Sequence, residues 1–301
     1  MPPNLTHPLS GVYAAAVTPL GADGAPDLAA WQRLLSFLAE RGAHGALLLG
    51  TTGEGPSFSA AERIEIFQAA AAVRPQEFRL LAGTGTPSLT ESIALNQAVF
   101  ELGYEAVLVL PPFFFRNADE DGLFEWYAEL IERSVPEGRW LLGYHIPGVS
   151  GIPLPLGLLQ RLQAAYPSRF GGLKDSTGEL ASAVAYAAGL PGCAVLVGND
   201  KLMTPGMAAG AAGCITALAN LRSAELRAIY EAFLWGEDPS AHQAALDPLR
   251  SAMDAMPPAP AYLKALLHAQ HNFPPWRVRL PLQGFSPEQV KQALSALNGL
   301  K

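Results

Sequence analysis

Eight short apolar segments recur along the chain, and segments with a helical pattern separate them. The centres of the apolar segments lie about 18–35 residues apart, which is the spacing of repeated strand–helix units. The segments are apolar throughout instead of alternating with polar residues, as in parallel strands that are buried on both faces. The sequence therefore predicts an α/β fold, the (β/α)8 TIM barrel. We expect its strands at Val12–Thr18, Ala46–Gly50, Leu80–Gly83, Ala106–Leu110, Leu141–His145, Gly171–Lys174, Ala194–Val197 and Gly213–Thr216.

The intervening segments have the pattern of helices with one buried face. In Leu28–Arg41 the apolar residues recur three and four positions apart, which is the spacing of one helix face. Ser59 begins the next expected helix, Ser59–Val73, and Glu62 follows it by three residues, which predicts a capping box. A third helix of this kind is expected at Thr90–Leu102.

We expect the chain to divide into a barrel and a helical appendage. Eight strand–helix units end near residue 235, so residues 1–235 are predicted to form the barrel. Residues 236–301 are predicted to form a C-terminal helical extension with helices at Ser240–Met253, Ala259–Gln270 and Ser286–Asn298. No flexible Gly/Ser linker precedes them, which favours an extension packed on the barrel over a second independent domain.

Composition narrows the class of protein. Half of the 301 residues are hydrophobic, which is enough apolar material for a large core, and the net charge of −7 argues against nucleic acid as the main partner. We expect no secretory signal, since no basic residue precedes Arg33. No apolar run reaches the length of about 18 residues that a membrane span requires. With only two cysteines, Cys193 and Cys214, the protein is expected to be cytoplasmic, with buried thiols.

A lysine stands at the end of the sixth predicted strand. The carboxyl ends of the strands are where barrels of this type carry their chemistry. Lys174 is the first of only five lysines in the chain, and it follows an apolar run. Burial disfavours the ammonium form, and a neutral amine attacks a ketone to form a Schiff base. The alternative is a structural lysine that reaches the rim and pairs with Asp175.

Two other strand ends bring polar groups to the same edge. Gly50-Thr51-Thr52-Gly53-Glu54 follows the second strand, and its hydroxyl and backbone N–H groups suit a carboxylate or a phosphate. Tyr144 ends the fifth strand, where its phenol can transfer a proton, whereas His145 points to the opposite side of the strand. The alternatives are an ordinary glycine-rich turn and a core tyrosine with a satisfied hydroxyl.

The remaining strand ends complete a small polar pocket. Gly198-Asn199-Asp200-Lys201 follows the seventh strand, and Gly213-Cys214-Ile215-Thr216 forms the eighth. We expect no metal site, because the histidines have no acidic ligand set beside them. The residues expected to bind substrate are Thr52, Gly53, Ser176, Gly198, Lys201, Ile215 and Thr216.

Three of these segments together resemble the dihydrodipicolinate synthase / N-acetylneuraminate lyase family. They are Gly50-Thr51-Thr52-Gly53-Glu54, Tyr144-His145-Ile146-Pro147 and Gly172-Leu173-Lys174-Asp175-Ser176, in that order and at the spacing of barrel strands. The resemblance covers nearly the whole chain. It implies a (β/α)8 barrel with a helical extension, assembly as a homotetramer, and a class I aldolase mechanism that uses no metal or organic cofactor.

The resemblance also implies a role for each residue that matches a motif. Lys174 would condense with the ketone of pyruvate or another 2-keto acid. Tyr144 would move protons to and from the Schiff-base intermediate. Thr51 and Thr52 would hold the pyruvate carboxylate, and Thr51 would also hydrogen-bond Tyr144. The expected partners are therefore small molecules, a keto acid and an aldehyde.

Departures from the family pattern narrow the range of expected substrates. Dihydrodipicolinate synthases typically have a second tyrosine where this chain has Phe114 and an arginine where it has Val149, and sialic acid lyases have an acidic residue where it has Lys201. We therefore predict a Schiff-base lyase or aldolase that acts on pyruvate or a 2-keto-3-deoxy acid, with Lys201 at an anionic or hydroxylated substrate tail. The alternatives are dihydrodipicolinate synthase activity and a non-catalytic regulatory protein that binds a keto acid.

Overall fold

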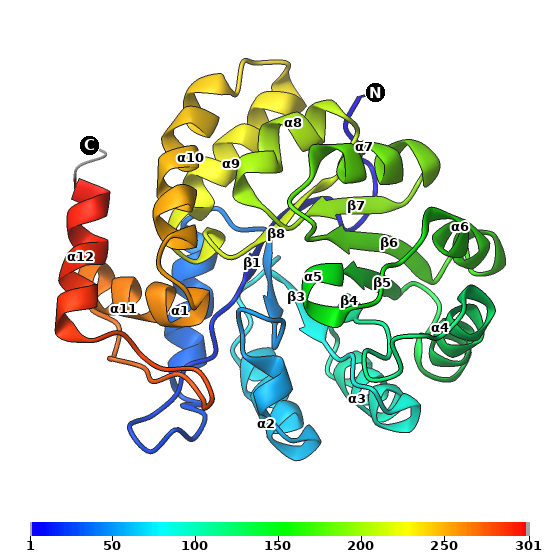
Figure 1. Ribbon diagram of the computed structural model, residues 1–301, viewed down its shortest axis with the longest axis horizontal. Coiled ribbons are helices and arrows are strands. Elements are labelled where there is room, and N and C mark those ends of the chain that lie inside the picture. Colours follow the sequence, from blue (N-terminus) through cyan, green and yellow to red (C-terminus); the bar gives the residue numbers. More distant parts are fainter. Residues whose placement is uncertain (1, 299–301) are drawn as a thin grey trace.

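Eight parallel strands close into a barrel in chain order, and each strand pairs with the next (Figure 1). The structure is a computed structural model that describes residues 2–298. Pairing of the first strand with the last, with Val12 beside Cys214, completes the closure. The predicted (β/α)8 barrel is confirmed. Its strands are β1 (Gly11–Ala15), β2 (Gly45–Leu48), β3 (Arg79–Gly83), β4 (Ala106–Val109), β5 (Trp140–His145), β6 (Phe170–Asp175), β7 (Ala194–Val197) and β8 (Gly213–Thr216).

Successive side chains on each strand alternate between the barrel interior and the surrounding helices. On β5, Leu142 and Tyr144 belong to a buried cluster inside the barrel, whereas Leu141 belongs to the cluster shared with the helices. Both sides are buried, which explains why the strands are apolar throughout.

Two strands end at least two residues earlier than predicted. The expected strand Val12–Thr18 ends at Ala15, because the backbone N–H of Val17 donates to the side chain of Asn220 (3.1 Å) and leaves the ladder. The expected strand Ala46–Gly50 ends at Leu48, because Leu49 has a left-handed backbone conformation with φ of 54°. The boundaries of the other strands agree with the prediction to within one residue.

Helices form a ring around the strands (Figure 1). The predicted capping box is confirmed, because the Ser59 side chain and the Glu62 carboxylate each accept a hydrogen bond from the other's backbone N–H. None of the described helices is long and apolar enough to cross a bilayer. The ring holds α1 (Ala30–Glu40), α2 (Ala60–Ala72), α3 (Leu89–Glu101), α4 (Glu120–Ser134), α6 (Leu156–Ala165), α7 (Leu180–Gly189), α8 (Met203–Ala208) and α9 (Ala219–Trp235), with short helical turns at η1 (Gly55–Ser57), α5 (Pro147–Ser150) and η2 (Asp200–Leu202).

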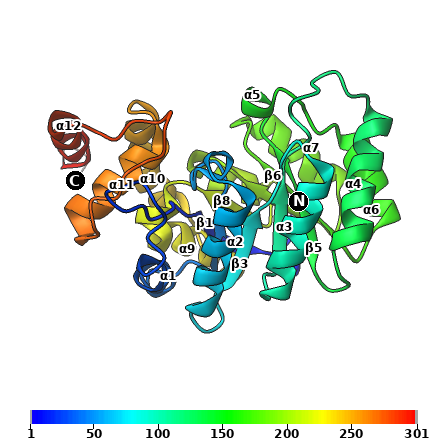
Figure 2. The ribbon, with the colours of Figure 1, turned by 90° about the horizontal axis from the view of Figure 1, so that it is seen from below.

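Three further helices gather on one side of the barrel (Figures 1 and 2). They are α10 (Ser240–Asp254), α11 (Ala259–His271) and α12 (Pro287–Asn298), as predicted to within one residue at each end. The first of them packs against α9 and against η2, which follows β7. Gly236 ends α9 in a left-handed conformation with φ of 72°, and we propose this turn as the boundary between barrel and extension.

A buried ion pair joins the extension to the loop that follows β2. Lys264 on α11 is 1% exposed, and its ammonium group contacts the carboxylate of Glu54. The same carboxylate accepts a hydrogen bond from the backbone N–H of Arg279 (2.6 Å), and Lys264 also donates to the carbonyl of Arg277 (2.6 Å). Burial lowers the pKa of Lys264, and the charge of Glu54 opposes that shift. The loop after β2 is therefore held by residues far away in the sequence.

Replacement of Lys264 by methionine is expected to lower the free energy of unfolding by about 3–5 kcal/mol, because it leaves the Glu54 charge buried without its partner. The measurement is urea denaturation followed by circular dichroism. Lys291→Met is the matched control, since Lys291 is exposed on α12, and it should change the free energy of unfolding by less than about 0.5 kcal/mol. A loss below about 1 kcal/mol for Lys264→Met would show that the pair does not hold the loop.

Candidate active site

The register of β5 and β6 places Tyr144 beside Lys174 inside the barrel. The Lys174 Nζ donates to the Tyr144 hydroxyl at 3.4 Å and lies 4.6 Å from the centre of the tyrosine ring. Both side chains are 4% exposed. The strand ends thus bring an amine and a phenol together in a buried position.

The neighbours of this pair face the helices. His145 packs against the ring of Tyr186 on α7, and its Nδ1 accepts a hydrogen bond from the backbone N–H of Leu154 (3.0 Å). Asp175 accepts from the backbone N–H and the hydroxyl of Thr177, at 3.0 and 2.8 Å. The described residues therefore do not form the alternative arrangement, in which Lys174 pairs with Asp175.

Tyr144 is surrounded by groups that favour its ionised form. Its hydroxyl lies 3.1 Å from the Thr51 Oγ1. Burial by itself would raise the pKa of Tyr144, but the charge of Lys174 and hydrogen bonds from Thr51, Ser176 and Lys174 together lower it below 10. A phenol with a lowered pKa next to an amine is suited to accept and return a proton.

The loop after β2 carries free backbone N–H groups beside Tyr144 and Lys174, on residues that line the same cavity. Within residues 2–298, no acceptor bonds the backbone N–H of Thr51 or Thr52. The loop packs tightly behind them, because a Cβ on Gly53 would lie 2.8 Å from the Leu49 nitrogen and 2.9 Å from the Ala16 carbonyl oxygen. Thr18 also donates to the Gly53 carbonyl (2.6 Å). Fixed, unpaired N–H groups of this kind bind a carboxylate.

These groups line a cavity of about 350 Å³ at the carboxyl ends of the strands, a volume in the range of about 300–1,000 Å³ that is usual for small-molecule sites. Six of the residues predicted from the sequence line it together: Thr51, Thr52, Tyr144, Lys174, Ser176 and Gly198. Close packing explains the glycine, because a Cβ at position 198 would lie 2.1 Å from the Ser176 Oγ.

Four other predicted site residues do not line this cavity. Gly53 is buried in the loop after β2, and Lys201 lies in η2, but neither is among the residues that line the cavity. Ile215 and Thr216 on β8 are both fully buried, and Ile215 belongs to the cluster inside the barrel. Their roles in binding remain predictions.

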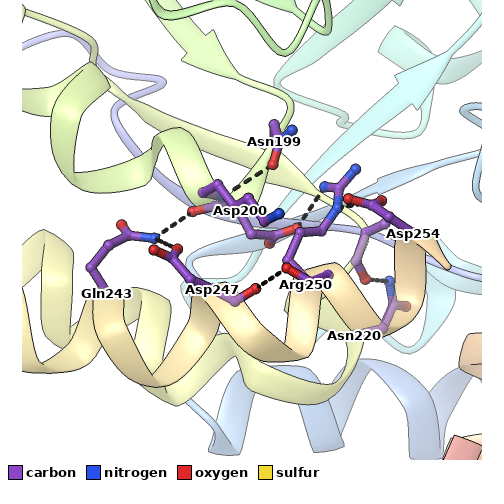
Figure 3. A network of polar contacts seen from close by, with 10 residues as sticks. Asn199, Asp200, Asn220, Gln243, Asp247, Arg250 and Asp254 are labelled. Atoms are coloured by element: carbon purple, nitrogen blue, oxygen red, sulfur yellow. Dashed lines mark hydrogen bonds and ion pairs between the residues drawn. The ribbon is translucent and has the colours of Figure 1, made fainter. Parts of the chain in front are cut away.

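Sequence reasoning missed a wall that the extension contributes. Arg250, Met253 and Asp254 on α10, with Pro257 and Ala259 after it, line the cavity beside Asn199. Figure 3 shows that Arg250 reaches from α10 to Asp200, which follows β7. The four-residue spacing of Arg250 and Asp254 is that of a pair on one helix face, but no local pattern connects α10 with β7. Across residues 2–298, no three His, Cys, Asp or Glu side chains gather as a metal site would require.

Comparisons with known proteins agree with this arrangement. Residues 8–299 match the model of the Dihydrodipicolinate synthetase family. A protein of Chloroflexus aurantiacus described as an uncharacterized DapA-like lyase is 39% identical over 281 residues, 93% of each chain. The 4-hydroxy-tetrahydrodipicolinate synthase 2 of Streptomyces coelicolor is 32% identical, over 95% of this chain and 93% of that protein.

A solved structure resembles the chain over almost its whole length. The dihydrodipicolinate synthase of Agrobacterium tumefaciens superimposes with a TM-score of 0.86 at 28% identity, covering 96% of this chain and 99% of that one. Fold, site geometry and sequence similarity lead to the same conclusion. This chain belongs to the dihydrodipicolinate synthetase family, whose members are class I pyruvate-dependent lyases and synthases that form a lysine Schiff base.

Proposed function

We propose that this protein is a carbon–carbon lyase or aldolase that acts on pyruvate or a 2-keto-3-deoxy acid through a Schiff base on Lys174. The observation that carries the proposal is the buried Lys174 amine 3.4 Å from the Tyr144 hydroxyl, in a cavity also lined by Thr51 and Thr52, whose backbone N–H groups are free. The amine supplies the nucleophile, the phenol supplies proton transfer, and the N–H groups suit the carboxylate of a keto acid.

The proposed cleavage begins when the neutral Lys174 amine attacks the C2 ketone. Tyr144 gives its proton to the departing C2 oxygen, water leaves, and the products are an iminium on Lys174 and a phenolate on Tyr144. Tyr144 takes the proton of the C4 hydroxyl as the C3–C4 bond breaks. The bonding electrons pass into the iminium and leave an enamine, and the aldehyde departs. Protonation of the enamine at C3 and hydrolysis of the imine then release pyruvate and the free lysine. Condensation follows the same steps in reverse.

Thr51 and Thr52 have two proposed tasks. Their backbone N–H groups bind the keto-acid carboxylate, which directs the ketone carbon toward Lys174. The Thr51 hydroxyl, 3.1 Å from the Tyr144 hydroxyl, holds the phenol in place for proton transfer.

We also propose a homotetramer in the cytoplasm. Large apolar side chains are exposed at Phe114, Phe115 and Trp235, by 74%, 68% and 70%, and exposed apolar groups of this size favour burial between subunits. The unpaired, buried thiols of Cys193 and Cys214 suit a reducing compartment.

Dihydrodipicolinate synthase activity is a second candidate, because relatives named 4-hydroxy-tetrahydrodipicolinate synthase are 30–33% identical to the chain. Its second substrate would be aspartate semialdehyde. Where family synthases typically carry an arginine, Val149 is 62% exposed and offers no charge to a carboxylate. Assay of the condensation of pyruvate with aspartate semialdehyde tests this candidate directly.

Incubation with pyruvate and borohydride is expected to add the mass of one reduced pyruvate adduct to the wild-type protein, because hydride reduces the iminium to a stable amine. Mass spectrometry of the intact protein and of its peptides should place the adduct at Lys174. The Lys174→Ala variant should gain no adduct, whereas Lys291→Ala, which removes an exposed lysine on α12, should gain it like the wild type. An adduct on another lysine, or none on the wild type, would contradict the proposal.

The Tyr144→Phe variant is expected to lose about 100- to 10,000-fold in kcat for aldol cleavage, since it removes the proton-transfer group but keeps the ring. The measurement is pyruvate release from a 2-keto-3-deoxy acid. Tyr104→Phe is the matched control, because the Tyr104 hydroxyl is also buried but donates to the Phe67 carbonyl (3.0 Å), outside the cavity. Equal activity of the two variants would show that the Tyr144 hydroxyl does not transfer the proton.

A further inference from the structure

The cavity wall contributed by the extension contains a guanidinium group held by two carboxylates. Arg250 donates from Nη1 to the Asp200 Oδ2 (2.9 Å) and from Nε to the Asp254 Oδ1 (2.8 Å), as Figure 3 shows. Asp200 is fully buried, and its carbonyl accepts a hydrogen bond from Gln243 (3.1 Å). Burial by itself would lower the pKa of Arg250, but Asp200 and Asp254 outweigh it and raise that pKa. The guanidinium is therefore charged and fixed in orientation.

The charges of this wall do not leave a free cation for an anionic group. Arg250 is paired with the carboxylate of Asp254, which also lines the cavity, and with that of Asp200, which is fully buried and does not line it. The three side chains together carry one net negative charge. Among the described residues that line the cavity, the only other cation is Lys174, which the proposed reaction uses. Lys201 follows Asp200 directly, but its side chain is not part of the cavity wall.

The same wall keeps several hydrogen-bonding groups free. Within residues 2–298, no acceptor bonds the Arg250 Nη2. Asn199 uses its side-chain oxygen for the backbone N–H of Lys201 (3.1 Å), which leaves its amide nitrogen to donate. The Asp254 side chain is 47% exposed, and its second oxygen is free to accept a hydrogen bond. Donors and an acceptor side by side match hydroxyl groups, which both donate and accept.

We propose that Arg250, Asp254 and Asn199 form a specificity wall that selects an uncharged, hydroxylated aldehyde, or the corresponding tail of a 2-keto-3-deoxy sugar acid, and rejects tails that carry a phosphate or a carboxylate. This inference rests on the proposed function and names the substrate class for the same cavity. A site built to hydrogen-bond hydroxyl groups discriminates strongly against an analogue that lacks them, and like charges brought together repel.

Three aldehydes of three carbons test the wall in condensation with pyruvate: glyceraldehyde, propanal and glyceraldehyde 3-phosphate. We expect kcat/KM for glyceraldehyde to exceed both of the others by at least about tenfold. Equal use of propanal would show that the hydroxyl groups are not recognised, and preference for the phosphorylated aldehyde would show that the wall attracts anions. Either result would overturn the inference.

The Asp254→Asn variant tests the charge balance separately. It removes one negative charge, so the ratio of kcat/KM for the phosphorylated aldehyde to that for glyceraldehyde should rise at least about tenfold. Both substrates are measured on one preparation, so that partial loss of folded protein cancels from the ratio. Glu231→Gln is the matched control, because it breaks a similar pair with Arg227 (2.9 Å, four residues apart) on α9 and should leave the ratio unchanged. A ratio that Asp254→Asn does not move would overturn the inference.

Trapping of pyruvate by the wild-type protein separates this inference from the proposed function, since trapping needs no aldehyde. If the protein traps pyruvate on Lys174 and yet prefers the phosphorylated aldehyde, the proposed mechanism stands and the proposed specificity wall is wrong. If the protein traps no pyruvate, both the proposed mechanism and the proposed specificity wall are wrong.

Discussion

Successive side chains on a strand point to opposite sides, and in β5 and β6 this places Tyr144 and Lys174 inside the barrel while His145 and Asp175 face outward. Everything else in the site depends on this alternation. A shift of one residue in either strand would exchange the phenol for an imidazole or the amine for a carboxylate. The register is held by burial on both faces, since an exchanged side chain would have to enter an apolar layer.

The extension completes the cavity whose reacting groups lie on the barrel strands. Through Lys264 and Glu54 it holds the loop that presents the free N–H groups, and through Arg250 and Asp200 it contacts the turn after β7. Both ion pairs are buried on at least one side, where a charge without its partner is costly. The barrel thus carries the reacting groups, and the extension positions one loop and closes one wall.

Much of this arrangement could be predicted from the sequence. Runs that are apolar throughout predicted eight parallel strands, and a lysine, a tyrosine and two threonines at strand ends predicted a group of side chains that the structure does bring together. Two strand ends differ from the prediction, and each has a physical cause. β2 stops early because Leu49 has a left-handed conformation, and β1 stops because the Asn220 side chain takes the N–H of Val17. Neither feature changes the hydrophobic periodicity from which the strand ends were predicted.

The sequence by itself determined which side chains reach the mouth of the barrel, because strand period and strand order are local patterns with few compatible arrangements. Only the tertiary structure decided which residues close the cavity. Arg250 lies 50 residues from Asp200, and Lys264 lies 210 residues from Glu54. Pairings over such separations depend on how the extension packs against α9 and η2, and no spacing along the chain encodes that contact. Lys201 was therefore a candidate for substrate contact by its position in the sequence, whereas in the folded protein Arg250 occupies the cavity wall.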